Sequence, residues 1–195
     1  FRPTLLLLVF GCFLSGCISL GEVDVPVSSF AARAEAAAQA ARVVRVVHAD
    51  TYILMVGATT YRLRLLGVDA PETTQPFGKQ AMDSVGRVLR AGRVVLVAKS
   101  GYDLYGRTLG TVLLPTGTTT AAGRPVPLDS LLVSRGWAWA ADERRARPRL
   151  YAEQLSAQQR GLGLWKCGTA EPVPPHIWRG FNAKVKQLYR GGCTW

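Results

Sequence analysis

Acidic and basic side chains lie close together in residues 62–72, which read RLRLLGVDAPE. Arg64 lies in the first half of this stretch, and Asp69, Ala70 and Glu72 follow Gly67 in the second half. Carboxylate and carbonyl oxygens are the ligands that hard divalent cations such as calcium prefer. The planar guanidinium of an arginine can bind a phosphate through two parallel hydrogen bonds. The stretch therefore combines candidate metal ligands with a candidate phosphate-binding group.

Two other segments carry residues of the same kinds. Asp50 lies in HADT, residues 48–51, and Arg107 ends DLYGR, residues 103–107. A metal site, two arginines for a phosphate and a spare carboxylate are the parts of metal-assisted phosphodiester cleavage. Any one of these residues alone is more often a turn residue or a solvated surface group. The prediction therefore depends on all of them occurring together.

The flanking residues predict the elements that position these groups. Apolar, β-branched runs predict strands at residues 43–47, 52–56, 93–99 and 107–114. The first two runs form a hairpin with Asp50 at its tip, and Arg107 lies at a second tip. In residues 62–65, leucines alternate with arginines, so Arg62 and Arg64 are expected on the face opposite Leu63 and Leu65. Helical periodicity predicts helices at residues 77–90, 128–135 and 150–160.

With these residues in place, the chain resembles the staphylococcal nuclease (thermonuclease) family. The matching segments, in order, are VRVVHADTY, YRLRLLGVDAPET, FGKQA, DLYGR and GLGLW, and they cover residues 42–165. The resemblance implies an α+β, mainly β, fold: an OB-type five-stranded β-barrel with three packed helices. It also implies a calcium-dependent endonuclease that acts on DNA and RNA, breaks the P–O5′ bond and leaves 3′-phosphate ends.

The resemblance implies which residues bind calcium. Asp50 and Asp69 are the expected carboxylate ligands, and the main-chain carbonyl of Ala70 is the third ligand. The family often has Thr at this last position, but a main-chain ligand does not need the Thr side chain. His48 stands where the family usually has Asp, and Ala49 replaces a usual Gly. His48 either changes the calcium affinity by removing a negative charge or is a turn residue without a role.

The resemblance also implies the roles of the remaining groups. Arg64 and Arg107 hold the phosphoryl oxygens and neutralise charge in the transition state. Glu72 orients the attacking water, with a role as general base as a hypothesis. Tyr105 donates a hydrogen bond to a terminal phosphate. Leu104 stands where a Lys is common, so one electrostatic contact is expected to be absent.

Length and charge limit the class of protein. The 195 residues suffice for one compact domain with appendages. The 24 Lys and Arg against 13 Asp and Glu give a formal charge of +11. This excess favours a polyanionic partner, nucleic acid first and an anionic membrane second. A generic basic protein is the alternative that charge alone leaves open.

Residues 1–20 are typical of a lipoprotein signal peptide. A basic residue precedes an apolar run that is shorter than a typical transmembrane helix. The segment LSGC, residues 14–17, resembles the bacterial lipobox, in which Cys17 is lipidated. An ordinary signal peptide cleaved elsewhere is the alternative. We expect an exported protein of the bacterial cell envelope, lipid-anchored in the periplasm or at the outer membrane, or else secreted.

The remaining boundaries follow from composition. Residues 21–41 are an Ala-rich linker, residues 42–166 are the nuclease-like domain, and residues 167–195 are a basic tail. Cys167 and Cys193 either form a disulfide in an exported protein or stay as free thiols. Four apolar tail residues at helical spacing predict a helix folded back on the domain: Ile177, Phe181, Val185 and Leu188. Contact of this helix with nucleic acid or membrane is the alternative.

Two other function classes compete with the enzyme. OB-type barrels often bind single strands without cutting them, so a non-catalytic nucleic-acid-binding module is the main alternative. An envelope protein that holds anionic lipid through its basic surface is a weaker one. The presence of both acidic ligands, both arginines and Glu72 favours the nuclease, which we expect to be a monomer.

Overall fold

The computed structural model describes residues 37–115, 125–141, 148–169, 172–189 and 193. The predicted signal peptide with Cys17, and residues 21–36 of the predicted linker, lie outside this range. No helix within the described residues is long and apolar enough to cross a membrane.

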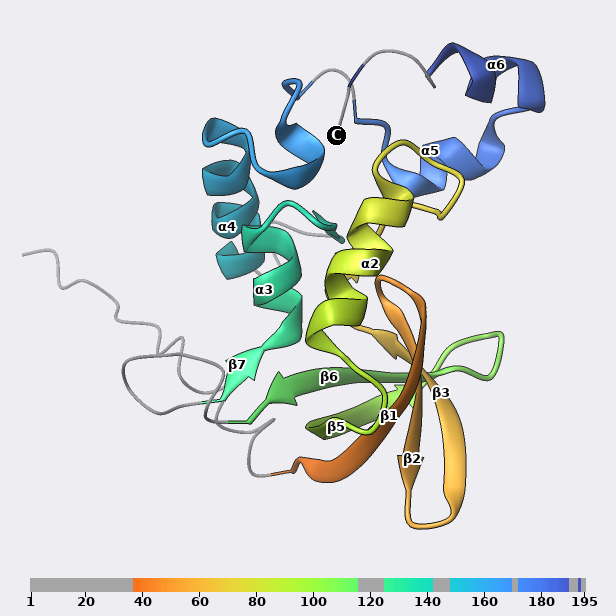
Figure 1. Ribbon diagram of the computed structural model, residues 1–195, viewed down its shortest axis with the longest axis vertical. Coiled ribbons are helices and arrows are strands. Elements are labelled where there is room, and N and C mark those ends of the chain that lie inside the picture. The colour runs from red at the N-terminus through yellow and green to blue at the C-terminus, as the bar shows by residue number, and fades with distance from the viewer. Residues whose placement is uncertain (1–36, 116–124, 142–147, 170–171, 190–192, 194–195) are drawn as a thin grey trace, which may run out of the picture.

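A closed β-barrel is the main element of the fold (Figure 1). Within the described residues, six strands form one sheet in the order β3-β2-β1-β5-β6-β7. Their bounds are β1 Gln39–His48, β2 Thr51–Val56, β3 Thr59–Leu65, β5 Val94–Tyr102, β6 Thr108–Leu114 and β7 Val126–Pro127. Parallel pairing of β3 with β6 closes β1, β2, β3, β5 and β6 into a five-stranded barrel. The predicted barrel is therefore confirmed.

The barrel begins slightly earlier than the sequence pattern indicated. Residues 39–42 of β1 pair antiparallel with residues 94–97 of β5, although residues 39–41 belong to the Ala-rich stretch assigned to the linker. Ala41 is buried in the core. Small apolar side chains give little periodic signal, so only the pairing with β5 identifies these residues as a strand.

The three predicted helices are present: the first two pack on the barrel, and the third packs on the second. They are α2 Gly78–Val88, α3 Leu128–Ser134 and α4 Pro148–Gln159, with α2 against β1, α3 against β6 and α4 against α3. The apolar side of α2 points inward through Ala81 and Val85, which are both fully buried. A short pair of strands, β4 Val68–Asp69 and β8 Trp139–Ala140, joins the exit of β3 to the segment after α3. A 3-10 turn, η1 Gly163–Trp165, follows α4 and buries Trp165.

The C-terminal residues fold as two short helices, α5 Pro175–Gly180 and α6 Ala183–Leu188, and not as one. The backbone is extended at Phe181, and the Asn182 side chain caps α6 by accepting a hydrogen bond from the Val185 N–H at 3.0 Å. The predicted apolar stripe was wrong, because Leu188 is 79% exposed while Trp178 is 1% exposed. The break after α5 changes the helical phase, so the residues of the stripe do not share one face.

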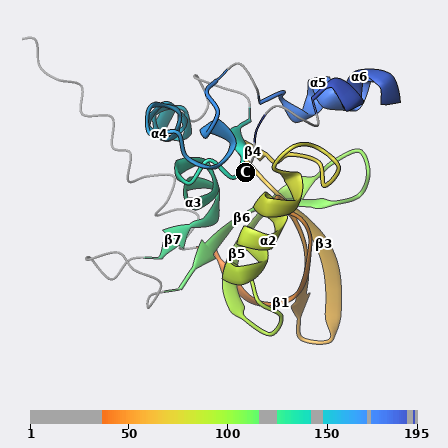
Figure 2. The same ribbon diagram turned by 45° about the horizontal axis from the view of Figure 1, so that its top comes forward.

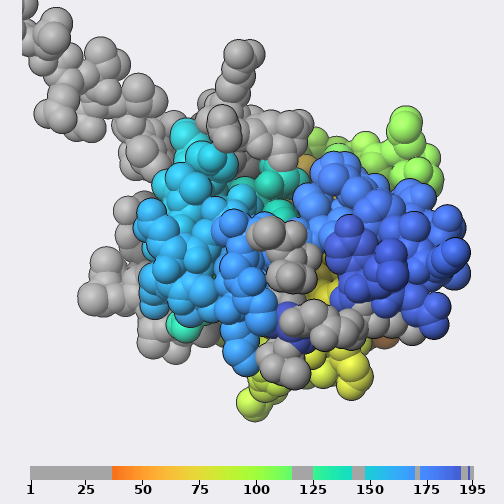
Figure 3. Space-filling model, turned by 90° about the horizontal axis from the view of Figure 1, so that it is seen from above, coloured from red at the N-terminus to blue at the C-terminus, as the bar shows by residue number. Residues whose placement is uncertain are grey.

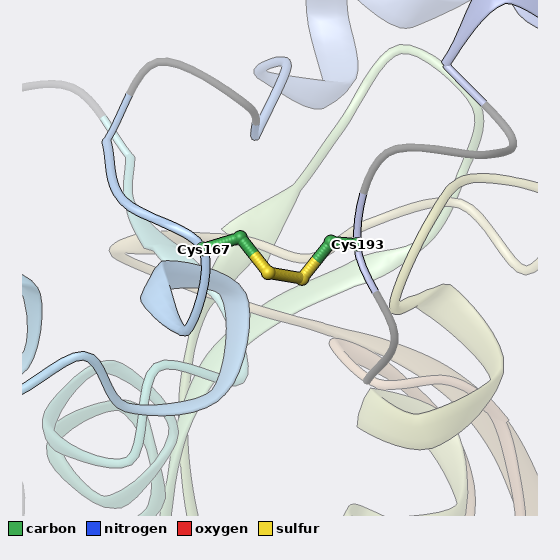
Figure 4. The surroundings of a disulfide bond; sticks show 2 residues. All are labelled: Cys167 and Cys193. Carbon is green, nitrogen blue, oxygen red and sulfur yellow. A yellow bond between two sulfur atoms is a disulfide. The ribbon is translucent and has the colours of Figure 1, made fainter.

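A disulfide joins Cys167 to Cys193, whose Cα atoms are 6.0 Å apart (Figure 4). Of the two alternatives that the sequence left open, the structure therefore has the disulfide. Figures 1 and 2 show α5 and α6 beyond the N-terminal end of α2, next to the loop that precedes that helix.

Gly110 lies where β6 meets both of its barrel neighbours, β3 and β5. A Cβ atom at Gly110 would lie 2.7 Å from the Ala98 carbonyl oxygen and 3.3 Å from Leu63 Cδ1. The first distance is shorter than real Cβ contacts allow, and the obstructing atom is backbone. A side chain at this position would therefore push β6 away from β5.

We predict that Gly110→Ala destabilises the barrel by about 1–3 kcal/mol, as overpacking in a core typically does. Thermal unfolding followed by circular dichroism measures the change. Gly86→Ala is the matched control, because Gly86 lies in α2 and a Cβ atom added there would have no other atom within 4 Å. That change should stabilise the helix by about 0.5–1 kcal/mol. Equal melting temperatures for the two variants would contradict the prediction.

Candidate active site

A pocket of about 600 Å³ opens at the rim of the barrel. It lies where the β1–β2 turn, the exit of β3 and the β5–β6 turn come together. Every site residue predicted in these segments lines it: Asp50, Arg64, Asp69, Ala70, Glu72, Tyr105 and Arg107. These predicted residues, from Asp50 to Arg107, thus share one cavity. Their individual roles remain predictions.

Asp50 is held at the tip of the β1–β2 hairpin, as predicted. Its carboxylate is nearly buried, with 6% of the residue exposed. Oδ1 accepts a hydrogen bond from the Thr51 hydroxyl at 2.9 Å, and Oδ2 accepts one from the Ala70 N–H at 2.8 Å. The main-chain carbonyl of Asp50 accepts another from the Leu65 N–H at 2.9 Å. These bonds connect the hairpin tip to the exit of β3 and fix the direction of the carboxylate.

Arg64 bridges the two candidate metal-binding carboxylates. Its Nη1 lies 2.6 Å from Asp50 Oδ2, and its Nη2 lies 3.0 Å from Asp69 Oδ1. The arginine side chain is 18% exposed, so both ion pairs are largely shielded from water. The alternation predicted for β3 is correct, because Leu63 and Leu65 are buried on the opposite face. One guanidinium therefore holds both carboxylates toward a common region of the pocket.

Asp69 is partly buried and lies near two other carboxylates, Asp50 and Glu72. Burial raises the pKa of this carboxyl above its ordinary value, and the nearby Asp50 and Glu72 carboxylates raise it further. The guanidinium groups of Arg64 and Arg179 act in the opposite direction. A cation in the pocket would relieve the same repulsion between carboxylates.

The donor chemistry fits a hard divalent cation. Two carboxylates and a main-chain carbonyl are all oxygen donors, and water can complete such a site. Within the described residues, no group of three or more His, Cys, Asp or Glu side chains forms a metal site. The candidate site is compatible with that finding, because Ala70 contributes a backbone atom. The residues that could hold a metal are thus Asp50, Asp69 and Ala70.

Arg107 is positioned by Asp103, which the sequence analysis did not identify. Arg107 Nε donates to Asp103 Oδ2 at 2.6 Å. Asp103 Oδ1 accepts hydrogen bonds from the main-chain N–H groups of Tyr105 and Arg107, both at 2.9 Å. Burial acts to raise the pKa of Asp103, but these hydrogen bonds outweigh it and lower the pKa. An Asp directly before an exposed turn was the available signal, because Asp side chains often accept hydrogen bonds from the backbone N–H groups that follow them.

The loop that carries Glu72 packs tightly against the start of α2. The Glu72 main-chain N–H donates to Gln75 Oε1 at 3.2 Å, and its carbonyl accepts from the Gln75 N–H at 2.9 Å. A Cβ atom at Gly78 would lie 1.8 Å from the Glu72 carbonyl oxygen, so only glycine allows this approach. The backbone of Glu72 is therefore fixed, and its side chain is 30% exposed toward the pocket.

Several residues without an assigned role also line the pocket: His48, Thr51, Arg62, Gly106 and Arg179. Arg179 is the unexpected one, because it comes from α5, beyond the part of the chain that carries the family motifs. The sequence signals were the basic composition of the tail and the helical spacing that predicted a folded-back helix, and neither gave the direction of this side chain. His48 lies in the pocket wall and is not an isolated surface residue.

A barrel whose rim joins paired carboxylates to arginines has the parts of an enzyme that cleaves phosphodiesters. Residues 62–167 match the protein family described as staphylococcal nuclease homologue. The chain therefore belongs to the staphylococcal nuclease family and is a nuclease of the hydrolase class. The predicted family and enzyme class are confirmed.

Similar proteins come from several enterobacteria. An Escherichia coli protein named "Uncharacterized endonuclease" is 38% identical over 138 residues, which cover 71% of this chain and 83% of the relative. An Escherichia coli "Protein ParB" is 36% identical over 140 residues, 70% of this chain and 77% of the relative. A Shigella flexneri "Micrococcal nuclease" is 32% identical over 139 residues, 70% of this chain and 78% of the relative.

We predict that Asp103→Ala lowers kcat by roughly 10- to 100-fold, somewhat less than the loss of a preorganised donor itself. The expected cause is an Arg107 side chain that is no longer held in place. Steady-state cleavage of nucleic acid measures the effect. Asp83→Ala is the control, because Asp83 is a half-exposed carboxylate whose ion pair with Lys79 lies outside the pocket. If both variants kept the kcat of the unmodified protein, Asp103 would have no positioning role.

Proposed function

We propose that the protein is a calcium-dependent endonuclease that hydrolyses DNA and RNA and leaves 3′-phosphate ends. The observation that carries this proposal is the pocket itself, which joins oxygen donors suited to calcium with two arginines and Glu72. Charge supports it as well, since a net charge of +11 attracts a polyanionic substrate.

Asp50, Asp69 and the Ala70 carbonyl would hold the calcium ion. When bound, the ion supplies positive charge that polarises a phosphoryl oxygen and offsets charge in the transition state. The hydrogen bonds from Thr51 and Ala70 keep the Asp50 carboxylate oriented for this role.

Arg64 and Arg107 would bind the scissile phosphate from two sides of the pocket. Arg64 is carried by β3 and Arg107 by the turn between β5 and β6, so the barrel closure sets the space between them. Each is already fixed by carboxylates before substrate arrives. Preorganised donors of this kind are typically each responsible for about a 10²- to 10³-fold increase in kcat.

Glu72 would orient the attacking water and accept its proton. The water oxygen bonds to phosphorus, the P–O5′ bond breaks, and the O5′ atom leaves as a hydroxyl after taking a proton from solvent. The phosphate stays on the O3′ atom of the upstream fragment, which therefore ends in a 3′-phosphate. Tyr105 is 85% exposed at the pocket rim, where its hydroxyl would donate to a terminal phosphate.

A non-catalytic binding module is the competing function. An OB-type barrel supplies a surface for nucleic acid without any catalytic group. The enzyme is favoured because Glu72, Arg64 and Arg107 lie in the same pocket as the candidate metal ligands. Binding of nucleic acid without cleavage in the presence of calcium would show that the protein is a non-catalytic binding module.

The cell envelope is the proposed location, with a lipid on Cys17 as the membrane anchor and a monomeric nuclease domain. The support comes from the sequence of residues 1–20, where a basic residue and an apolar run precede LSGC. An anchored nuclease would act on nucleic acid outside the cytoplasm.

Digestion of DNA and of RNA by the purified protein over a calcium titration tests the activity. We expect cleavage that rises with calcium and stops with chelator. The products should resist extension by a polymerase until a phosphatase removes the 3′-phosphate. Unchanged digestion in chelator would contradict the metal dependence, and products that a polymerase extends directly would contradict the bond assignment.

Glu72→Gln is the variant that tests the mechanism within the same assay. It should lower kcat by about 10²- to 10⁴-fold, the range of general-base catalysis, while nucleic-acid binding in chelator persists. Full activity of Glu72→Gln would remove this residue from the mechanism.

We predict that Cys17→Ser moves the protein from the membrane fraction to the soluble fraction or leaves an uncleaved precursor. Fractionation of expressing cells and mass spectrometry of the N-terminus measure the outcome. Cys12→Ser is the control, because Cys12 lies in the same apolar stretch outside the LSGC segment. An acylated Cys17→Ser protein would show that the lipid is attached elsewhere.

A further inference from the structure

The C-terminal extension, residues 172–189 with Cys193, packs against the nuclease domain as a fixed element. Trp178 is 1% exposed, and Phe181 and Tyr189 stack with ring centroids 5.6 Å apart. Gln75, in the loop that carries Glu72, donates a side-chain hydrogen bond to the Val173 carbonyl. Figure 3 shows the extension in dark blue over the same end of the molecule as α4. The extension lies outside residues 62–167, which carry the family match.

The disulfide ties the end of this extension to Cys167, which precedes it in the chain. Cys167 follows η1 at the end of the family match, and Cys193 is 26 positions later. Both α5 and α6 therefore lie within a covalently closed loop. Such a loop limits the positions that α5 can take relative to the pocket.

Arg179 of α5 reaches into the active-site pocket. Its Nη1 donates to Glu72 Oε1 at 2.8 Å, and its Nη2 lies 3.8 Å from Asp69 Oδ2. An arginine is permanently charged in proteins, and the hydrogen bond to Glu72 raises the pKa of Arg179 further. The arginine comes from 107 positions beyond Glu72 in the sequence.

The exposure of Arg179 distinguishes it from Arg64 and Arg107. Its side chain is 53% exposed, against 18% for Arg64 and 27% for Arg107. An ion pair this accessible to water contributes little to stability. A guanidinium has five N–H donors. Within the described residues, the Arg179 guanidinium makes one hydrogen bond, from Nη1 to Glu72, and the 3.8 Å from Nη2 to Asp69 is too long for a second. The Arg179 guanidinium therefore has N–H donors and a positive charge available to an anionic ligand in the pocket.

Building on the proposed nuclease function, we propose that Arg179 is a substrate-binding residue that the extension adds to the site. Its guanidinium binds a backbone phosphate of the nucleic acid next to the scissile one, on the Glu72 side of the pocket. The Cys167–Cys193 disulfide holds Arg179 in reach of that phosphate. Glu72 and Asp69 keep the side chain turned into the pocket before substrate binds.

Binding to a short, fluorescently labelled single-stranded DNA in chelator tests this inference without cleavage. Anisotropy gives the Kd between about 50 and 200 mM salt, the range over which phosphate contacts weaken strongly. Arg179→Ala should raise the Kd about tenfold, the effect of losing one charged hydrogen-bonding group. The slope of log Kd against log salt should fall by about 0.7, the value for one phosphate contact on a single strand.

Lys184→Ala is the matched control, because it removes one positive charge from the same extension outside the pocket. It should leave both the Kd and the slope within error of the unmodified protein. Arg179→Lys keeps the charge and should retain most of the slope. Circular dichroism checks that each variant is folded.

Cleavage kinetics separate substrate binding from other roles of Arg179. In calcium, Arg179→Ala should raise KM about as much as Kd, with kcat within about threefold of the unmodified protein. A fall in kcat with unchanged KM and Kd would mean that Arg179 only orients Glu72, and would overturn the inference. Increased activity would mean that Arg179 blocks the pocket, and would overturn it too.

A double variant, Cys167→Ser with Cys193→Ser, tests the role of the disulfide. It should raise the Kd as Arg179→Ala does, and adding Arg179→Ala to it should cause no further loss. An unchanged Kd would show that packing alone positions Arg179. If the unmodified protein neither binds nor cuts nucleic acid, the proposed function fails. If it does both while Arg179→Ala behaves like Lys184→Ala, only the present inference fails.

Discussion

The ion pairs of Arg64 with Asp50 and Asp69 are the interaction on which the site depends. Two carboxylates that are largely removed from water repel each other, and a single guanidinium between them offsets that repulsion. Buried ion pairs add little net stability, but removal of one partner leaves an uncompensated charge. The network therefore organises the pocket more than it stabilises the fold. A divalent cation would act on the same charges, so under the proposed function metal binding and phosphate binding would be coupled at this point.

The barrel converts this local network into a pocket with two opposite walls. Parallel pairing of β3 with β6 places the exit of β3 beside the turn that follows β5, so the Arg64 segment faces the Arg107 segment. On its other side β6 lies close to β5, and the absence of a side chain at Gly110 permits this approach. Asp103 then fixes Arg107 from within its own turn. The distance between the two arginines is thus a property of strand pairing and does not depend on either loop alone.

The extension adds a third wall that the barrel lacks. Its own helices are short, so propensity alone would not keep them folded, and Trp178 together with the disulfide supplies the missing constraint. Attachment to the Gln75 loop brings α5 next to the segment that carries Glu72. The pocket at the barrel rim therefore includes a basic group from a segment outside the family match.

Local patterns in the sequence determined the strands, the hairpin tip at Asp50 and the orientation of Arg64, because alternation and turn residues act over a few positions. The same patterns did not reveal that residues 39–41 extend β1, nor that the tail breaks into two helices at Phe181. The direction of Arg179 was decided only by the tertiary structure. Its position results from packing and a covalent bond between segments far apart in the chain, and such contacts leave no periodic signal in the residues that make them.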